Sequence, residues 1–318
     1  MSQRPTADEV IGYHDSLSNW DRWGHDDLRG TLNLITPDVR MRAFGLVETG
    51  DVVSLSRDID PENPDPLGSG IARALRFMNV DEVAHHVGKG VTRFDAVTET
   101  VLISAHGSNT HLETSAHYSW DRKNYNGYDV SDTTTCMGGT RLSIHLASSG
   151  VFTRGVLLDI CALKGVDWLE PGYPIMPDDV EAAEQRQGVR VSPGDVLLVH
   201  TGHVRRTLSQ GLVGDPRNPR IAGLHAACLP FLRDRDVAVL GSDAIQDVQP
   251  SGYDSFDLFR PVHTFGMTAL GLWFIDNAEL TELAAKCARI GRWEFLFACL
   301  PWRFIGVTAS ATNPVAIF

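Results

Sequence analysis

The chain has 318 residues, of which 43% are hydrophobic and 21% are charged, and this composition is typical of a globular protein with a sizeable core. Its 28 basic and 40 acidic residues give a formal net charge of -12, which argues against nucleic acid as a partner because phosphate binding requires a basic surface. The sequence contains no run of about 18 apolar residues and begins without the apolar stretch of a signal peptide, so we expect no membrane partner.

The five cysteines are scattered along the chain, and none forms a Cys-x-x-Cys pair. An odd number without such spacing predicts neither a disulfide framework nor a cysteine zinc site. We therefore expect buried thiols in the reduced state, as in a cytoplasmic protein. The cysteines are Cys136, Cys161, Cys228, Cys287 and Cys299.

Glycine, proline and aspartate divide the chain into short elements. Residues 58–70 are rich in all three and predict a surface loop. Gly50-Asp51 and Gly194-Asp195 each place a turn before an apolar run, and we expect both runs to begin strands. Further strands are expected at residues 94–104, 155–160, 196–201 and 237–240, while residues 270–275 and 293–300 fit either a strand or a helix.

Helices are expected between these strands. Asp178 is a good N-cap with Glu181 three residues later, and Gly188 is a stop signal. Residues 222–232 and 279–290 also have helical spacing. Because the elements do not alternate regularly, a mixed α/β fold is favoured over an α/β barrel or a doubly wound sheet. No glycine-rich nucleotide loop is present, so a nucleotide cofactor has no support.

Residues 104–121 carry the densest group of chemically active side chains: three histidines, a carboxylate and several small residues. In an extended segment His111 and Glu113 share one face, because side chains alternate along a strand. If a helix begins just afterwards, Glu113 and His117 lie one turn apart. The carboxylate would then lie between two imidazoles.

Two kinds of chemistry fit this group. Imidazole nitrogens and carboxylate oxygens are ligands for zinc or manganese. The same residues also suit a metal-free acid–base pair in which the carboxylate orients a histidine. Most other histidines stand alone or, like His200, lie in an apolar strand, and surface or structural roles explain them better than ligation does.

The segment resembles the motif His-x-Gly-Thr-His-x-Asp-x-x-x-His of the cyclase superfamily, which includes bacterial kynurenine formamidase, isatin hydrolase and certain dienelactone hydrolases. Thr110-His111, Glu113 and His117 set the register. Further blocks resemble the longer branch of this superfamily along nearly the whole chain. They lie at residues 22–24, 30–34, 125–127, 154–159, 194–198 and, more loosely, 307–318.

The resemblance implies a hydrolase that breaks a C–N or C–O bond next to a carbonyl in a small-molecule substrate. In metal-dependent members, one or two Zn or Mn ions are held by the motif and by a later histidine and glutamate. The later histidine matches His263, and Asp276 is the carboxylate nearest to the later glutamate. The implied metal ligands are therefore His111, Glu113, His263 and Asp276.

Three of the expected ligand positions differ from the motif. Gly107 stands where the first histidine is expected, and His106 beside it would face the other way on a strand. Glu113 replaces the bridging aspartate, and the late glutamate is at best an aspartate. These changes favour one ion over two, with a metal-free site as the alternative, since a catalytic site needs only about three protein ligands.

The expected reaction is hydrolysis of an amide, formamide, cyclic imide or lactone by water activated on the ion. His117 would take a proton from that water and return it to the leaving group, while Glu113 binds the metal or orients His117. The ion or a backbone N–H would stabilise the oxyanion. Trp20, Trp23 and Phe77 are candidates for the substrate pocket, although packing in the core explains them better.

Two other interpretations stay open. A metal-independent lyase, dehydratase or cyclase would use His117 and Glu113 as its acid–base pair, and the departures from the motif at Gly107 and Glu113 favour this alternative. A non-catalytic relic that binds a small molecule is the third interpretation, although His111, His117 and His263 argue against it. Sensitivity to a chelator separates the first two, and tight ligand binding without turnover would favour the third.

The resemblance also implies an architecture. We expect a single cyclase-like domain over residues 1–318, of the swivelling β/β/α type, with an N-terminal extension of about 45 residues. Its centre is a mixed, barrel-like β-sheet with flanking helices, which is an α/β fold. Members of the family are usually dimers or tetramers, so we expect a homodimer or homotetramer.

Overall fold

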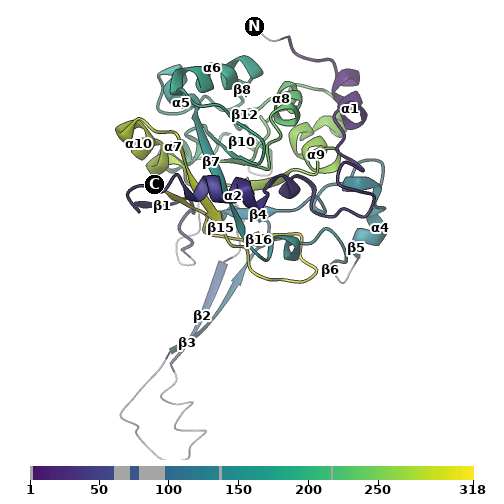
Figure 1. The fold of residues 1–318 in the computed structure, drawn as a ribbon, viewed down its shortest axis with the longest axis horizontal. Helices are drawn as coiled ribbons and strands as arrows, with labels where there is room; N and C mark the ends of the chain where they lie inside the picture. Colours follow the sequence, from purple (N-terminus) through teal and green to yellow (C-terminus); the bar gives the residue numbers. More distant parts are fainter. Residues whose placement is uncertain (1–2, 61–71, 79–96, 136–137, 216–217) are drawn as a thin grey trace, which may run out of the picture.

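A computed structural model describes residues 3–60, 72–78, 97–135, 138–215 and 218–318, with the backbone alone described for 72–78, 97–100 and 135. Figure 1 shows helices and strands mixed along this chain, with a nine-stranded sheet at the centre. None of the helices in the described ranges has the length and apolar character that crossing a bilayer requires.

The strands fall into one large sheet and four two-stranded pairs. The large sheet has the order β1-β17-β15-β7-β9-β13-β14-β4-β16. Its strands are β1 (Val52–Ser54), β4 (His111–Glu113), β7 (Val151–Asp159), β9 (Val196–His200), β13 (Val239–Ser242), β14 (Trp273–Asp276), β15 (Glu294–Cys299), β16 (Ala309–Ala311) and β17 (Val315–Ile317). The pairs are β2 (Ala72–Met78) with β3 (Val97–Ile103), β5 (Thr134–Thr135) with β6 (Gly138–Gly139), β8 (Pro174–Ile175) with β12 (Gly223–Leu224), and β10 (Gly214–Asp215) with β11 (Asn218–Pro219).

The helices are short and lie between the strands. The α-helices are α1 (Ala7–Ser16), α2 (Pro37–Phe44), α4 (Val130–Thr133), α5 (Ile160–Lys164), α6 (Pro177–Gln187), α7 (His203–Gln210), α8 (Leu229–Asp234), α9 (Pro261–Thr268) and α10 (Thr281–Ile290). The 3-10 helices are η1 (Gly30–Leu34), η2 (Tyr125–Gly127), η3 (Ile144–Ala147), η4 (Ala226–Cys228) and η5 (Phe256–Leu258).

The large sheet is mixed. Strands β7, β9, β13 and β14 run parallel to one another at its centre, and the outer strands pair antiparallel. The sheet curls into a half-barrel. Because neighbouring parallel strands end at the same edge, the residues that end β7, β9, β13 and β14 come close together in space.

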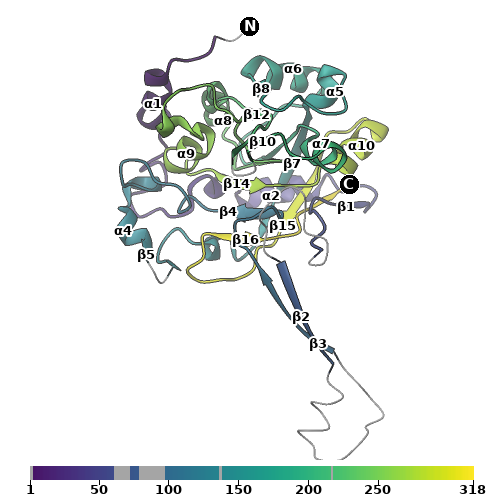
Figure 2. The same ribbon diagram turned by 180° about the vertical axis from the view of Figure 1, so that it is seen from behind.

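Both faces of this sheet are buried. Leu158 and Val199 belong to a core shared with α1, α5, α6, α8 and α9, whereas Leu157 and Leu198 belong to a core shared with η1 and α10. Successive residues of one strand thus enter different cores, as side-chain alternation requires. Figure 2 shows α1, α5, α6, α8 and α9 gathered on one side of the molecule.

Most predicted elements are present. The turns at Gly50 and Gly194 precede β1 and β9, and the expected strands correspond to β3, β7, β9 and β13. The ambiguous runs 270–275 and 293–300 contain strands β14 and β15. The prediction of a single helix at residues 222–232 is wrong. This segment is divided into β12, η4 and α8, because Gly223 and Leu224 pair with β8 instead.

Helix α6 begins two residues earlier than predicted. Its N-cap is Met176 rather than Asp178, because Pro177 occupies the first helical position, which suits a residue without a backbone N–H. The Asp179 carboxylate accepts a hydrogen bond from the Met176 N–H at 3.1 Å. Gly188 ends the helix in the left-handed conformation, as expected.

The N-terminal residues pack against the segment that carries α9 and β14. The Trp20 indole N–H donates to the Thr268 carbonyl at 2.7 Å, and the Asn19 amide donates to the Leu270 carbonyl at 2.9 Å. At Gly30, where φ is +55°, an added Cβ would lie 2.2 Å from the Gly271 carbonyl oxygen. Only glycine permits this close approach of two backbones.

Candidate metal centre and active site

His111 and Glu113 begin and end strand β4, and Leu112 between them enters the core next to α10. Alternation therefore turns both polar side chains to the opposite face, toward α9. His111 Nε2 lies 2.8 Å from Glu113 Oε1, and His111 Nδ1 lies 2.7 Å from the Asn109 carbonyl oxygen. The two residues share a face, as predicted.

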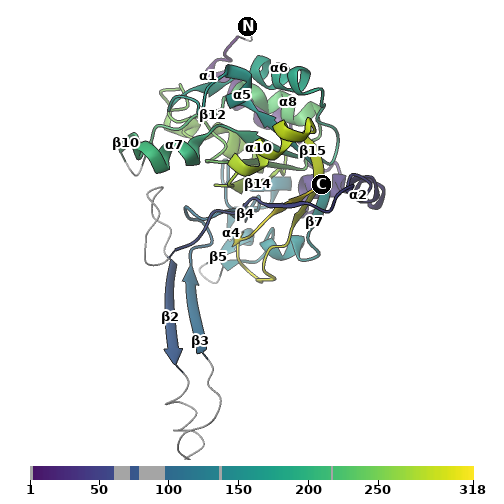
Figure 3. The same ribbon diagram turned by 90° about the vertical axis from the view of Figure 1, so that its left-hand side faces the viewer.

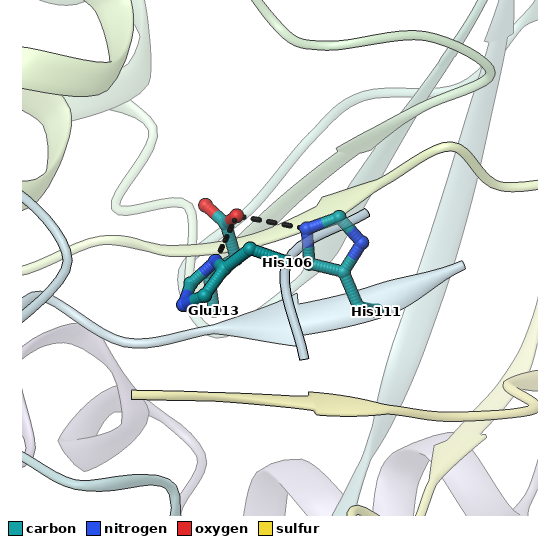
Figure 4. Close-up of side chains that lie close together, drawn as sticks. All are labelled: His106, His111 and Glu113. Carbon is teal, nitrogen blue, oxygen red and sulfur yellow. Dashed lines mark hydrogen bonds and ion pairs between the residues drawn. The ribbon is translucent and has the colours of Figure 1, made fainter. Parts of the chain in front are cut away.

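His106 is the residue that sequence reasoning missed. Its Nδ1 lies 2.9 Å from Glu113 Oε1, and its Nε2 lies 2.9 Å from Thr308 Oγ1. Figure 4 shows the His106 and His111 rings meeting at one Glu113 oxygen. The expectation that His106 faces away assumed a strand, but residues 104–110 form bends between β3 and β4. The small residues around it, Ser104, Gly107 and Ser108, were the available signal for a loop.

His117 approaches Glu113 through a turn and not through a helix. Residues 114–119 have no helical assignment, and the His117 N–H donates to the Thr114 carbonyl at 3.0 Å. This turn still brings His117 Nε2 to 3.8 Å from Glu113 Oε1. The His117 side chain is 30% exposed and its ring stacks on His106 with centroids 4.0 Å apart, so it lies where solvent reaches the cluster.

His263 comes from the first turn of α9. Its Nε2 lies 3.7 Å from Glu113 Oε2 and 3.4 Å from Asp276 Oδ2. Asp247 fixes the ring from behind: it lies 2.6 Å from Nδ1 and also accepts the backbone N–H groups of Val262 and His263. A carboxylate behind a histidine is the usual support for a metal-ligating imidazole, because it fixes the free nitrogen toward the site.

Asp276 ends strand β14 directly opposite His111 of β4. Phe274, two residues earlier, enters the core next to α9, so Asp276 faces the same way. Its Oδ1 accepts a hydrogen bond from the Gln246 amide at 2.8 Å, which leaves Oδ2 toward His263. The structure thus brings together all five residues named from the sequence, and adds His106 to them.

Two groups of metal-ligand type share Glu113. His106, His111 and Glu113 form one, and Glu113, His263 and Asp276 form the other, each with its ligand atoms within 4.8 Å of one another. His111 lies at one oxygen of Glu113 and His263 at the other, and the assignment of both histidines to a single ion stays a prediction.

The donor set fits a divalent ion. Glu113 Oε2 is buried and has no hydrogen-bond partner among the described residues, although a buried acceptor normally has one. Imidazole nitrogens and carboxylate oxygens are the ligands that zinc and manganese take in proteins. Glu113, with one oxygen toward each group, has the position of a bridging ligand.

The charges of the cluster are strongly coupled. Burial raises the pKa of Glu113, but hydrogen bonds with His106 and His111 outweigh it and hold that pKa well below its usual value. Burial lowers the pKa of His111, but Glu113 raises it to about 9. Burial also lowers the pKa of His263, but Asp276 and Asp247 raise it well above its usual value. Without an ion, protons therefore occupy the ring nitrogens that a metal would take.

The other aromatic candidates lie apart from this cluster. Trp20 and Trp23 are partly buried against Tyr125 in a small separate core, which agrees with packing as their role. The side chain of Phe77 lies outside the described residues. No sequence signal pointed to Asp247 or Gln246, since each contacts the cluster only through the residue that it supports.

The family model described as "Putative cyclase" matches residues 53–246, which is more than half of the chain. The chain therefore belongs to the putative cyclase family, as the resemblance at residues 104–121 predicted. No curated protein matches it.

Solved structures share this fold. A structure described as a novel cyclase has a TM-score of 0.83 and 28% identity, and the match covers 96% of this chain and 99% of that one. Isatin hydrolase A from Labrenzia aggregata has a TM-score of 0.58 and 15% identity over 86% and 94% of the two chains. Isatin hydrolase A from Ralstonia solanacearum has a TM-score of 0.53 and 15% identity, and the match covers 99% of this chain and 98% of that one. The mixed α/β fold predicted from the resemblance is confirmed.

Proposed function

We propose that this protein is a metal-assisted hydrolase that cleaves a C–N or C–O bond next to a carbonyl, in an amide, formamide, cyclic imide or lactone. The observation that carries this proposal is the pair of ligand groups that share Glu113, whose second oxygen is buried without a partner among the described residues. A divalent ion bound there would supply a Lewis acid that acidifies water and polarises a carbonyl.

The residues of the chain have distinct tasks in this proposal. His106, His111, Glu113, His263 and Asp276 would hold one or two ions of Zn or Mn. His117 would move the proton. Burial lowers the pKa of His117 to about 4, so at pH 7 the ring is neutral and its Nε2 can accept a proton from water. The same nitrogen then returns that proton to the leaving nitrogen or oxygen.

Metal analysis tests this proposal. Untagged protein is reconstituted with Zn or Mn, desalted and measured by elemental mass spectrometry, next to His111→Ala and the control His25→Ala, whose side chain is 87% exposed. We expect His111→Ala to lose at least one ion relative to wild type, because it removes a nitrogen of one ligand group, while His25→Ala keeps the wild-type content. A wild type that binds neither metal would contradict metal assistance.

Assays of turnover and ligand binding, with and without a chelator, address the alternatives. His117 Nε2 and Glu113 Oε1 lie 3.8 Å apart, which also suits a metal-independent lyase, dehydratase or cyclase that uses them as an acid–base pair. Turnover that survives thorough chelation would support that alternative. Tight ligand binding with no turnover under either condition would support a non-catalytic binding protein.

We further propose a homodimer or homotetramer in the cytoplasm. The β2–β3 hairpin extends away from the body (Figure 3), and β2 and β3 pair only with each other among the described strands. Val101 and Leu102, adjacent and so on opposite faces of β3, are 56% and 61% exposed. An isolated two-stranded ribbon is marginally stable in water, and a second copy would cover these side chains.

The proposed location in the cytoplasm is supported by the cysteines. The four described cysteines are free and buried, as in a reducing compartment.

Light scattering during gel filtration measures this assembly. We expect a dimer or tetramer for wild type and dissociation for Leu102→Glu, because a buried charge opposes association. Leu208→Glu on α7, where the side chain is 64% exposed, is the matched control and keeps the assembly. A monomeric wild type at micromolar concentration would rule the assembly out.

A further inference from the structure

A second group of ligand-type side chains lies away from Glu113. Asp159 ends β7 and His200 ends β9, and the two residues are direct partners in the parallel pairing of these strands. Cys161 is the second residue of α5, which follows β7 directly. All three side chains are buried, and one ligand atom of each lies within 4.8 Å of the others.

The contacts within this group leave it incompletely satisfied. Asp159 Oδ1 lies 3.0 Å from His200 Nδ1, and Cys161 Sγ lies 3.9 Å from the His200 carbonyl oxygen. His200 Nε2 is buried and has no hydrogen-bond partner among the described residues. Buried polar groups normally have a hydrogen-bond partner, so a missing ligand is a physical explanation for the unpaired nitrogen.

The surroundings carry negative charge. Asp243 follows β13, the next strand of the sheet, and its Oδ2 lies 4.0 Å from His200 Nε2. The Asp243 carboxylate accepts hydrogen bonds from the backbone N–H groups of Thr201 and His203, which hold it in place. Two carboxylates therefore flank one imidazole in a buried region, and a cation there would be stabilised by both.

This group is distinct from the candidate active site. Leu158 and Val199, the residues before Asp159 and His200, enter the core next to α9. Alternation thus turns Asp159 and His200 away from the face on which His111 lies. Cys161 reaches them from α5 and belongs to the core next to α9, and none of the three residues is a member of either ligand group at Glu113. The proposed hydrolysis uses none of these side chains.

We propose that Asp159, Cys161 and His200 bind one divalent ion of the zinc class, separate from any ion at Glu113. Thiolate, imidazole and carboxylate are all zinc donors, and a thiolate favours zinc over magnesium or calcium. Binding releases the thiol proton of Cys161 to solvent, and His200 ligates as a neutral imidazole through a nitrogen without a proton while the other ring nitrogen keeps its own. The ion would join the ends of β7 and β9 to the start of α5.

Cobalt substitution distinguishes the two sites by chemistry. A cobalt(II) ion bound to a thiolate gives a near-ultraviolet sulfur-to-metal charge-transfer band, whereas the ligands around Glu113 contain no sulfur and give none. Metal-free wild type is reconstituted with cobalt(II), and its near-ultraviolet absorbance is recorded. We expect the band in wild type and in Glu113→Gln, and its loss in Cys161→Ser.

Matched controls remove other thiols. Cys228→Ser replaces another buried free cysteine, and Cys136→Ser replaces the cysteine outside the described residues; both are expected to keep the band. If Cys161→Ser does not fold, His200→Gln replaces it and is expected to lose the band through loss of the nitrogen ligand. A wild type without the band, or a band that persists in folded Cys161→Ser, overturns the proposal.

Discussion

Replacing Glu113 by glutamine is expected to lower turnover about 10³-fold, the scale of losing a preorganised charge in an active site. Glutamine keeps the size of the side chain but removes the negative charge, which faces both His106 and His111 through one oxygen and His263 through the other. Both ligand groups should therefore lose their ion together. Elemental analysis and kcat, measured on the same preparations, check this prediction.

Glu170→Gln is the control for that substitution, because Glu170 is exposed and lies outside both ligand groups. It should keep the metal content and kcat of wild type. A Glu113→Gln variant that is folded, loaded with metal and fully active would mean that Glu113 bridges nothing, and the proposed site would be wrong.

Replacing His117 by alanine is expected to reduce kcat by about 10²–10⁴-fold, the usual contribution of a general acid–base group. The fold should survive, because the side chain is partly exposed and packs mainly on the ring of His106. Metal content should also survive, since His117 belongs to neither ligand group. This combination of lost turnover with retained metal separates a proton-transfer residue from a ligand.

The measurement compares kcat, metal content and thermal stability of His117→Ala with those of wild type and His25→Ala. Unchanged kcat would rule out proton transfer by His117 and would require another base near Glu113. Loss of metal together with kcat would instead make His117 a ligand.

Local patterns in the sequence predicted much of the site. Alternation along an extended segment placed His111 and Glu113 on one face, and β4 has that geometry. The turn at Gly194 and the apolar run after it predicted β9. These features depend on neighbours a few residues away, so they can be predicted from the sequence without knowledge of the fold. The single helix at 222–232 failed because the pairing of β12 with β8, a distant strand, outweighed helical spacing.

His106 shows the limit of local reasoning. The prediction that His106 faces away from Glu113 follows from the geometry of a strand. The chain between β3 and β4 bends instead, and the ring turns toward Glu113. A histidine one residue away from the motif position can therefore still reach the carboxylate when the backbone between two strands is irregular. His106 thus joins His111 at one oxygen of Glu113, and the number of ions stays a prediction.

The sequence by itself determined the family, through the resemblance of its motif blocks, and with it the mixed α/β class; the resemblance also implied His263 and Asp276, while side-chain alternation placed His111 beside Glu113. Only the tertiary structure decided which side chains meet. Pairing of β14 with β4 brings Asp276 opposite His111, and pairing of β7 with β9 brings Asp159 opposite His200, with Cys161 beside them. The spacing of the cysteines predicted no cysteine zinc site. Spacing rules detect only residues that are close in the sequence, whereas strand pairing also brings distant residues together.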